Sequence, residues 1–396
     1  MSVSRKAISV LVVAVGCIMM TGVLLRSHGV SDLRYLVSDN GDDGREKSQH
    51  AVVLVEQLKK NKPVQRFVMT KVEKTGSSTL RGILARYIMN NKLNVLTSCK
   101  CVHIKWTNKK SWTIGPRKKE KADALVNHAI YNKSFLQKFM KPGYEHIALV
   151  REPISWFKSA VRCFTKFGND EIRNRFHFTN PGPLKPEEVA TNDSLLFVTR
   201  FYKDLPDAWF HLGQLLWYGF NYADRNNITA INSFIASLIK QADVIMLYDQ
   251  LDASLVLLKR KFHWTFLDIF YTSYGLMANS EEELSKKSIK KILSKEVNLG
   301  DKLLYDGMNR TWWNYPELRE QHFWEEVKHF KELNREVNAY CSRKHELDDR
   351  AFVIPASEWH EALTVTPQLC FYLRLPSSNR NMVNQINDYA DKKCTF

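Results

Sequence analysis

The order of elements between residues 66 and 87 constrains the fold of this chain more than any other feature. Residues 66–70 form a short apolar run that suits a buried strand. Residues 75–79 are small and polar, and residues 80–87 then carry apolar side chains at helical spacing. A strand, a small-residue loop and a helix in this order are typical of the first unit of an α/β sheet.

Further strands follow the same pattern. We expect them at residues 124–128, 146–150 and 243–248, the last two each followed by a helix. Strands that alternate with helices predict an α/β fold with a mostly parallel central sheet flanked by helices. In such sheets, ligands bind at the carboxyl ends of the strands, so residues just after each strand are candidates for a site.

The first loop has the chemistry of an anion site. Successive backbone N–H groups at a strand-to-helix turn bind anions, and the helix dipole adds to the attraction. Gly76 permits close approach, hydroxyl groups add donors, and Lys74 can reach a phosphate. The segment is not a Walker A loop, because the first glycine is missing and the lysine precedes the glycine. The alternative to an anion site is an ordinary helix N-cap rich in Ser and Thr. The candidate residues are Lys74, Thr75, Gly76, Ser77, Ser78 and Thr79.

A second candidate follows the strand at residues 146–150. Arg151 offers a charged, forked set of donors, and Ser159 offers a hydroxyl one helical stretch later. Together they can hold one phosphate, although Arg151 alone could equally pair with a carboxylate.

The two segments together resemble a known family. K-T-G-S-S-T followed by R-E-P-x-x-x-F-x-S resembles the two PAPS-binding segments of Golgi carbohydrate sulfotransferases, and more narrowly those of the galactose 3-O-sulfotransferase family (PAPS is 3′-phosphoadenosine 5′-phosphosulfate). The resemblance runs from about residue 66 to residue 330, and the tail from Cys341 onward has no counterpart in it. Further matching positions are Asn127, His128, Leu215, Leu216, Trp217, Tyr218, residues 251–259, Trp264 and Asp268.

The resemblance implies a P-loop-like sulfotransferase fold, PAPS as co-substrate and no metal. It assigns the 5′-phosphosulfate to residues 74–79 and the 3′-phosphate to Arg151 and Ser159. Lys74 would stabilise charge on the departing phosphate. Family members commonly carry histidine where this chain has Glu73, which leaves the catalytic base open between Glu73 and His128. We expect His128 to take the proton and Glu73 to orient the acceptor or the imidazole.

The amino terminus predicts a membrane anchor. Residues 7–25 carry no charge and approach the length of about 20 residues that a spanning helix needs. Arg5 and Lys6 precede this run, so we expect residues 1–6 in the cytoplasm, residues 26–62 as a lumenal stem and residues 63–396 as a lumenal sulfotransferase domain. A cleaved signal peptide is the alternative. This topology predicts a single-pass type II protein of the Golgi membrane.

Sequons and cysteines fit a lumenal, oxidising compartment. Outside the anchor six cysteines remain, an even number that could form disulfides. Four N-x-Ser/Thr sequons begin at Asn132, Asn192, Asn227 and Asn309.

The net charge of +16 favours anionic ligands, and the predicted compartment disfavours nucleic acid.

The resemblance implies an acceptor with terminal galactose, on a glycolipid such as galactosylceramide or on a glycoprotein glycan. Two other interpretations remain: a kinase or nucleotide hydrolase with a degenerate loop, and a non-catalytic glycan-binding relative. The sequence leaves the acceptor and the oligomeric state open.

Overall fold

The computed structural model describes residues 62–98, 104, 106, 112–117, 119–166, 213–272, 298–342 and 351–374. By its internal contacts the chain divides into Met1–Lys62 and Pro63–Phe396, and the fold belongs to the second unit. The predicted anchor, the predicted stem up to residue 61 and the sequon at Asn192 lie outside the described residues. None of the described helices is long and apolar enough to cross a membrane.

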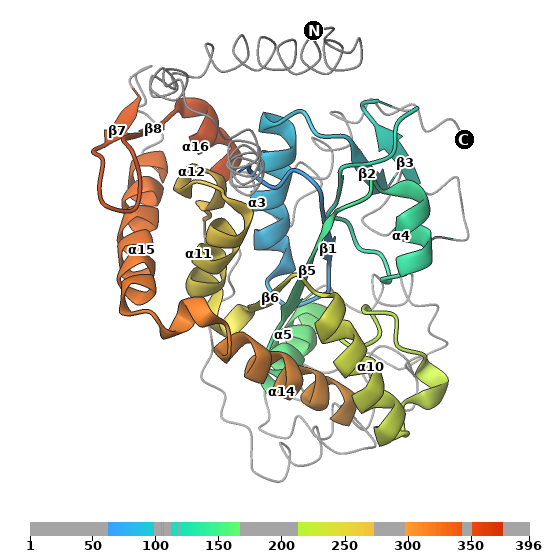
Figure 1. Cartoon of the computed structure of the whole chain (residues 1–396). Coiled ribbons are helices and arrows are strands. Elements are labelled where there is room, and N and C mark those ends of the chain that lie inside the picture. The colour runs from blue at the N-terminus through green and yellow to red at the C-terminus, as the bar shows by residue number, and fades with distance from the viewer. Residues whose placement is uncertain are drawn as a thin grey trace, which may run out of the picture. The chain divides into compact units, whose positions relative to one another are not determined.

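A six-stranded sheet forms the centre of the fold, in the order β3-β2-β4-β1-β5-β6 (Figure 1). β1 pairs in parallel with β4 and β5, β2 pairs in parallel with β4, and β6 pairs in parallel with β5. Only β3, at one edge, runs antiparallel to its neighbour β2. The predicted α/β class with a mostly parallel sheet is therefore confirmed. The strands are β1 (Phe67–Thr70), β2 (Val95–Ser98), β3 (Trp112–Gly115), β4 (Ala124–Leu125), β5 (Glu145–Val150) and β6 (Val244–Leu247).

Both faces of the sheet are buried, which explains why β1 reads as a continuous apolar run. All four residues of β1 are buried, and successive side chains point to opposite faces. Phe67 and Met69 pack in one cluster with Leu84 of α3 (Ser77–Asn90). Val68 packs in a second cluster with Leu136 of α4 (Lys133–Phe139).

Helices cover these faces in a connected set (Figure 1). The short α12 packs against α3 and α11, and α11 packs against β6 and α15. Elsewhere α14 packs against α10, α5 and β6. The helices not yet bounded are α5 (Pro153–Lys166), α10 (Ile228–Gln241), α11 (Leu251–Phe262), α12 (Phe266–Ile269), α14 (Leu299–Trp313) and α15 (Gln321–Ser342), with short 3-10 turns at Tyr222–Asp224, Tyr248–Gln250 and Pro316–Arg319.

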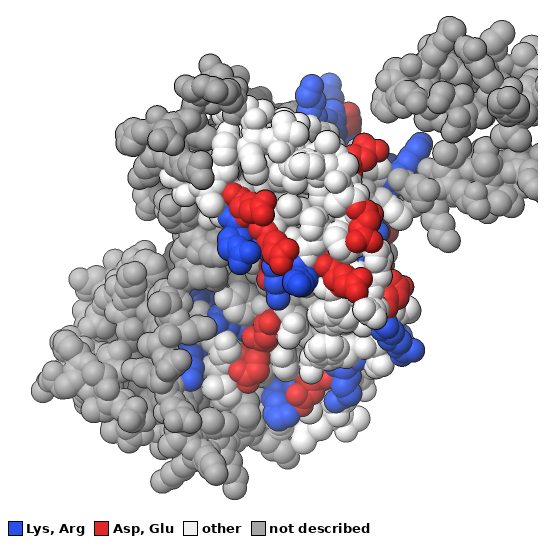
Figure 2. Space-filling view, turned by 90° about the vertical axis from the view of Figure 1, so that its left-hand side faces the viewer, with Lys and Arg blue, Asp and Glu red and all other residues white. Residues whose placement is uncertain are grey.

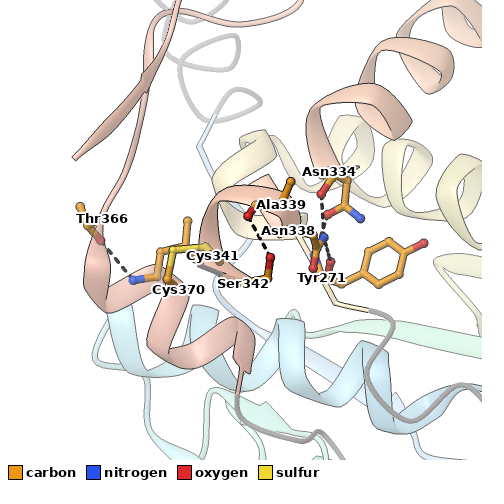
Figure 3. Close-up of a disulfide and its surroundings, with 9 residues drawn as sticks. Tyr271, Asn334, Asn338, Ala339, Cys341, Ser342, Thr366 and Cys370 are labelled. Carbon is orange, nitrogen blue, oxygen red and sulfur yellow. Dashed lines mark hydrogen bonds between the residues drawn. A yellow bond between two sulfur atoms is a disulfide. The ribbon is translucent and has the colours of Figure 1, made fainter. Parts of the chain in front are cut away.

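The described part of the tail after Cys341, which the motif resemblance did not cover, packs into the main hydrophobic core. It contains the hairpin β7 (Phe352–Ile354) and β8 (Leu363–Val365), followed by α16 (Pro367–Arg374). Figure 3 shows the disulfide that joins Cys341, near the end of α15, to Cys370 in α16. Both cysteines are buried, so the bridge lies inside the packing between the two helices.

Acidic and basic side chains are interspersed on the face that carries α15 (Figure 2). Lys259 and Arg260 of α11 lie 2.7 and 2.6 Å from the buried Glu326 carboxylate. On the described part of this face, the basic side chains of α11 are therefore neutralised by neighbouring acids. The described part of this face is therefore not uniformly basic, although the chain carries a net charge of +16.

The sequence placed four strands correctly to within a few residues and missed others. The expected strand at residues 124–128 ends at Leu125, so His128 lies beyond the strand. α3 begins at Ser77, which puts three of the predicted loop residues in its first turn. β2 and β3 were not predicted, because neither sequence is a continuous apolar run.

Candidate active site

The candidate residues meet because four neighbouring parallel strands end side by side. In sheet order these strands are β4, β1, β5 and β6. His128 lies just past the end of β4, and Lys71 to Lys74 follow β1. Arg151 follows β5, and Tyr248 follows β6. The structure thus brings together the two predicted phosphate segments and the predicted histidine, which are far apart in the sequence.

The loop after β1 has the backbone form of an anion-binding turn. Lys74 and Gly76 both adopt the left-handed conformation, with φ of 61° and 75°. A non-glycine residue is seldom held there, and such positions concentrate at functional sites. Gly76 caps α3, and the Thr79 N–H already donates to the Gly76 carbonyl at 3.0 Å, so the N–H groups of Ser77 and Ser78 are the ones that can face a ligand. Alternating right- and left-handed residues at a helix start form a concavity of N–H donors.

Two of the predicted hydroxyl donors are used within the loop. The buried Thr75 hydroxyl donates to the Val72 carbonyl at 3.0 Å, and the Ser77 hydroxyl donates to the same carbonyl. These bonds close the loop. Ser78 and Thr79 are only partly buried, so their hydroxyls and the backbone N–H groups are better placed to reach a ligand.

Tyr248 connects this loop with Arg151, and the sequence did not point to it. A Cβ atom on Gly76 would lie 2.3 Å from Cδ2 of the Tyr248 ring, so only glycine allows the ring to lie there. The Arg151 guanidinium lies 4.3 Å from the centre of the same ring, within range of a cation–π interaction. The available signal was the position of Tyr248 at the carboxyl end of the strand expected at residues 243–248.

Arg151 is fixed through both its backbone and its side chain. Its Nε donates to the Ser155 hydroxyl at 2.8 Å, and its Nη1 donates to the Lys74 carbonyl at 3.0 Å. The Gln214 side chain accepts from the Arg151 N–H and donates to the Arg151 carbonyl, both at 2.9 Å. Ser159, the predicted partner, lies further along α5 and is partly buried. Ser155 is the hydroxyl that orients the arginine.

A buried carboxylate supports Gln214 in turn. Asp301 accepts hydrogen bonds from the backbone N–H groups of Gln214 and Leu215, at 2.8 to 3.0 Å. Burial raises the pKa of Asp301 to about 6, against the opposing effect of these hydrogen bonds. A chain of hydrogen bonds therefore runs from α14 to the arginine.

His128 is paired with a lysine that the sequence interpretation overlooked. Its Nδ1 lies 2.7 Å from the Lys71 carbonyl, and its Nε2 lies 2.7 Å from Lys71 Nζ. A carbonyl oxygen only accepts, so Nδ1 carries the hydrogen and Nε2 is the acceptor. His128 is 6% exposed and Lys71 is 3% exposed, so both are buried.

The surroundings of Lys71 disfavour its charged form. Desolvation by burial is the main cause, and the positive charges of Arg81 and Lys74 add to it, while Glu73 opposes them. Together they lower the pKa of Lys71 to about 7. An amine with such a pKa can exchange a proton near neutral pH. The signal in the sequence was a lysine directly after a buried strand.

Glu73 is held through its backbone. Its carbonyl accepts a hydrogen bond from the Trp156 indole at 2.7 Å, which ties the loop to α5. Its side chain is partly buried and close enough to Lys71 to affect the lysine's pKa. In the described part of the chain, no group of three or more His, Cys, Asp or Glu side chains is placed to hold a metal ion.

The fold and the strand-end residues define an α/β protein in which a glycine-containing turn joins a buried central strand to a helix. Residues 3–358 match the family model described as Galactose-3-O-sulfotransferase. The chain belongs to this family, as the resemblance of its motifs predicted. The match runs past Cys341 to residue 358, so the expectation that nothing after Cys341 has a counterpart in the family was wrong for residues 341–358.

Individual relatives are distant. Galactose-3-O-sulfotransferase 3 of Bos taurus is 23% identical over 61% of this chain and 56% of its own length. Galactose-3-O-sulfotransferase 2 of Mus musculus is 23% identical over 70% of each chain. Galactosylceramide sulfotransferase of Mus musculus is 22% identical over 70% of this chain and 64% of its own length. The names of these relatives differ in the acceptor, so the similarity gives the family and not the acceptor.

The contact between Gly76 and Tyr248 predicts a specific sensitivity. Gly76→Ala should lower the free energy of unfolding by at least about 1 kcal/mol, because alanine in a left-handed conformation costs roughly that much. The new Cβ would also meet the Tyr248 ring. Thermal unfolding should show that Tyr248→Leu recovers part of the loss in the Gly76→Ala background. An unchanged melting temperature for Gly76→Ala would contradict the described loop.

The lowered pKa of Lys71 predicts a pH dependence of stability. Between about pH 7 and pH 10, the unfolded chain still binds the Lys71 proton while the folded chain has released it. Stability rises with pH wherever the unfolded state binds more protons. The melting temperature of the wild type, minus that of Lys71→Met, should therefore increase from pH 7 to pH 10. A difference that is constant or falls over this range would show that Lys71 keeps an ordinary pKa.

Proposed function

We propose that this chain is a PAPS-dependent sulfotransferase that transfers a sulfuryl group to a galactose hydroxyl, the 3-hydroxyl, of a glycolipid such as galactosylceramide or of a glycoprotein glycan. One observation carries the proposal. In a chain of the galactose-3-O-sulfotransferase family, the ends of four adjacent strands place an anion-binding loop beside a fixed arginine and a buried His128–Lys71 pair.

The residues at the strand ends fit the donor. The loop offers backbone N–H groups and Lys74, Gly76 lets the Tyr248 ring pack against the loop, and Arg81 adds buried positive charge. Residues 74–79 would hold the 5′-phosphosulfate, and Arg151 would hold the 3′-phosphate with Ser159 further along α5. Because the Thr75 and Ser77 hydroxyls bond Val72, the backbone carries most of the contact in this assignment.

The chemistry is an in-line transfer. PAPS supplies a sulfuryl group on a phosphate leaving group. The acceptor oxygen forms a bond to sulfur, and the bond from sulfur to the phosphate oxygen breaks. The positive charge of Lys74 stabilises the charge that develops on this phosphate. Lysine and backbone donors supply the positive charge, so the proposed step uses no metal.

The acceptor's proton goes to the His128–Lys71 pair. With its Nδ1 hydrogen directed at the Lys71 carbonyl, His128 has Nε2 as its basic atom. A neutral Lys71 amine can donate one hydrogen to Nε2 and keep a lone pair for the hydroxyl proton. Glu73 then has the role of orienting the acceptor or the pair. The Trp217 ring, 5.1 Å from the His128 ring, provides an aromatic surface for a sugar.

The direct test is transfer itself. The full-length chain in detergent is incubated with radiolabelled PAPS and a panel of galactosylceramide, lactosylceramide and N-acetyllactosamine. We expect label on at least one of them, and the product identifies the acceptor class. If no galactoside is labelled although the PAPS product binds, the chain is the non-catalytic glycan-binding relative. Activity with ATP and Mg²⁺ would support a kinase or nucleotide hydrolase instead.

The proposed base makes a prediction about variants. His128→Asn and Lys71→Met should each lower kcat by about 10²-fold or more, because general-base catalysis contributes on that scale. Glu73→Gln should have a smaller effect. Equilibrium binding of adenosine 3′,5′-bisphosphate (PAP), the product, should remain in all three variants. Near-normal turnover of His128→Asn, together with an inactive Glu73→Gln, would make Glu73 the base.

We also propose a single-pass type II anchor at residues 7–25 with the catalytic domain in the Golgi lumen. Asn132 and Asn227 support this assignment, because each is exposed and caps a helix through Oδ1, which leaves Nδ2 for a glycan. Asn309 lies within α14 and is partly buried.

Glycosidase treatment tests this topology. It should increase the gel mobility of the cell-expressed chain, and Asn132→Gln and Asn227→Gln should each reduce the shift more than Asn309→Gln does. No shift, with the body open to protease in intact microsomes, would contradict a lumenal domain.

A further inference from the structure

Helix α3 carries two buried arginines with different surroundings. Arg81 is 1% exposed and Arg86 is 3% exposed. Arg86 Nη2 donates to the carbonyls of Leu267, Asp268 and Phe270, at 3.3, 2.8 and 2.7 Å. These bonds tie α3 to α12 and the residue that follows it, so Arg86 has a structural explanation within the fold.

Arg81 has no such explanation. Among the described residues, neither its Nε nor its Nη2 has a hydrogen-bond acceptor, and no carboxylate pairs with it. Burial lowers the pKa of Arg81 to about 10, so the guanidinium keeps its charge at neutral pH. A buried charge without a partner is strongly unfavourable, so buried arginines normally pair with carboxylates or carbonyls.

The position of Arg81 directs it toward the donor loop. It lies five residues after Gly76, and side chains on a helix point back toward its amino terminus. Among the charged groups that act on Lys71, Arg81 has the largest effect, so its guanidinium is close enough to Lys71 to lower the lysine's pKa. The charged groups Lys74 and Arg81 therefore both act on the Lys71 amine, and Glu73 is the acid that acts on it.

A tetrahedral oxyanion at the loop would satisfy this arrangement. Guanidinium groups bind such anions through paired N–H donors, and the start of α3 adds backbone donors and its dipole. We propose that Arg81 is a further donor-binding residue, which binds the oxyanions at the 5′ end of the donor, next to Lys71 and Lys74. This inference rests on the proposed function, because it takes PAPS as the donor.

Two variants separate this role from a structural one. Arg81→Met removes the charge at similar length, and Arg86→Met is the matched control on the same helix. Without ligand, the melting temperature of full-length Arg81→Met should equal or exceed that of the wild type, because an uncompensated buried charge is removed. Arg86→Met should melt lower, because three carbonyls lose their donor.

Binding is then measured by calorimetry with PAPS, PAP, inorganic sulfate and adenosine 3′-phosphate, without acceptor. Arg81→Met should bind PAPS at least about tenfold more weakly than the wild type, and Arg81→Lys should recover part of the loss. Adenosine 3′-phosphate, which lacks the 5′ group, should bind both proteins equally. Weaker PAP binding as well would place the contact on the 5′-phosphate, and unchanged PAP binding would place it on the sulfuryl group. Weaker sulfate binding would show that the free anion occupies the same place.

Three results would overturn the inference. The first is that Arg81→Met binds PAPS as tightly as the wild type. The second is that Arg81→Met loses as much affinity for adenosine 3′-phosphate as it loses for PAPS. The third is that Arg81→Met, without ligand, melts at as low a temperature as Arg86→Met. The last result would assign Arg81 to the fold. If the wild type itself binds neither PAPS nor PAP, the proposed function fails. If the wild type transfers the sulfuryl group and Arg81→Met binds PAPS with unchanged affinity, the proposed function stands and only the role of Arg81 is wrong.

Discussion

The parallel pairing of β1 with both β4 and β5 fixes the relative positions of all candidate site residues. Each of these strands is buried, and their hydrogen-bonded register places their carboxyl ends at one edge of the sheet. The loop after β1 therefore lies between His128 on one side and Arg151 on the other. A shift of one residue in either pairing would turn the strand's side chains to opposite faces, so the buried core enforces this register.

The charge balance at this edge is the second constraint. The loop concentrates basic groups in a buried region. The cost appears in the lowered pKa of Lys71 and in Nε and Nη2 of Arg81, which have no acceptor among the described residues. Chains do not keep such groups for stability alone, since apolar residues of similar size often serve the fold as well. The same low-dielectric surroundings strengthen the attraction for an anionic ligand. These groups therefore lower the stability of the free protein and strengthen its binding of an anion.

Local patterns predicted the central strands and the two phosphate segments. Apolar runs such as those of β1 and β5 are recognisable because both faces are covered, and the residues after them were correctly taken as candidates. The partners of these candidates depend on tertiary structure. Nothing near Tyr248 in the sequence shows that its ring covers Gly76, and nothing near Gln214 shows that its amide clamps Arg151. The pairing of Lys71 with His128 joins residues 57 positions apart.

We propose that Arg151, held beside the donor loop by Ser155, Gln214 and Tyr248, recognises a 3′-phosphorylated adenosine nucleotide. Calorimetric binding of PAP and of adenosine 5′-phosphate to the full-length chain tests it most directly. We predict that the wild type binds PAP at least about tenfold more tightly than adenosine 5′-phosphate, and that Arg151→Met removes most of this difference. Equal affinity of the wild type for the two nucleotides, or a preference for PAP that survives in Arg151→Met, would contradict the account.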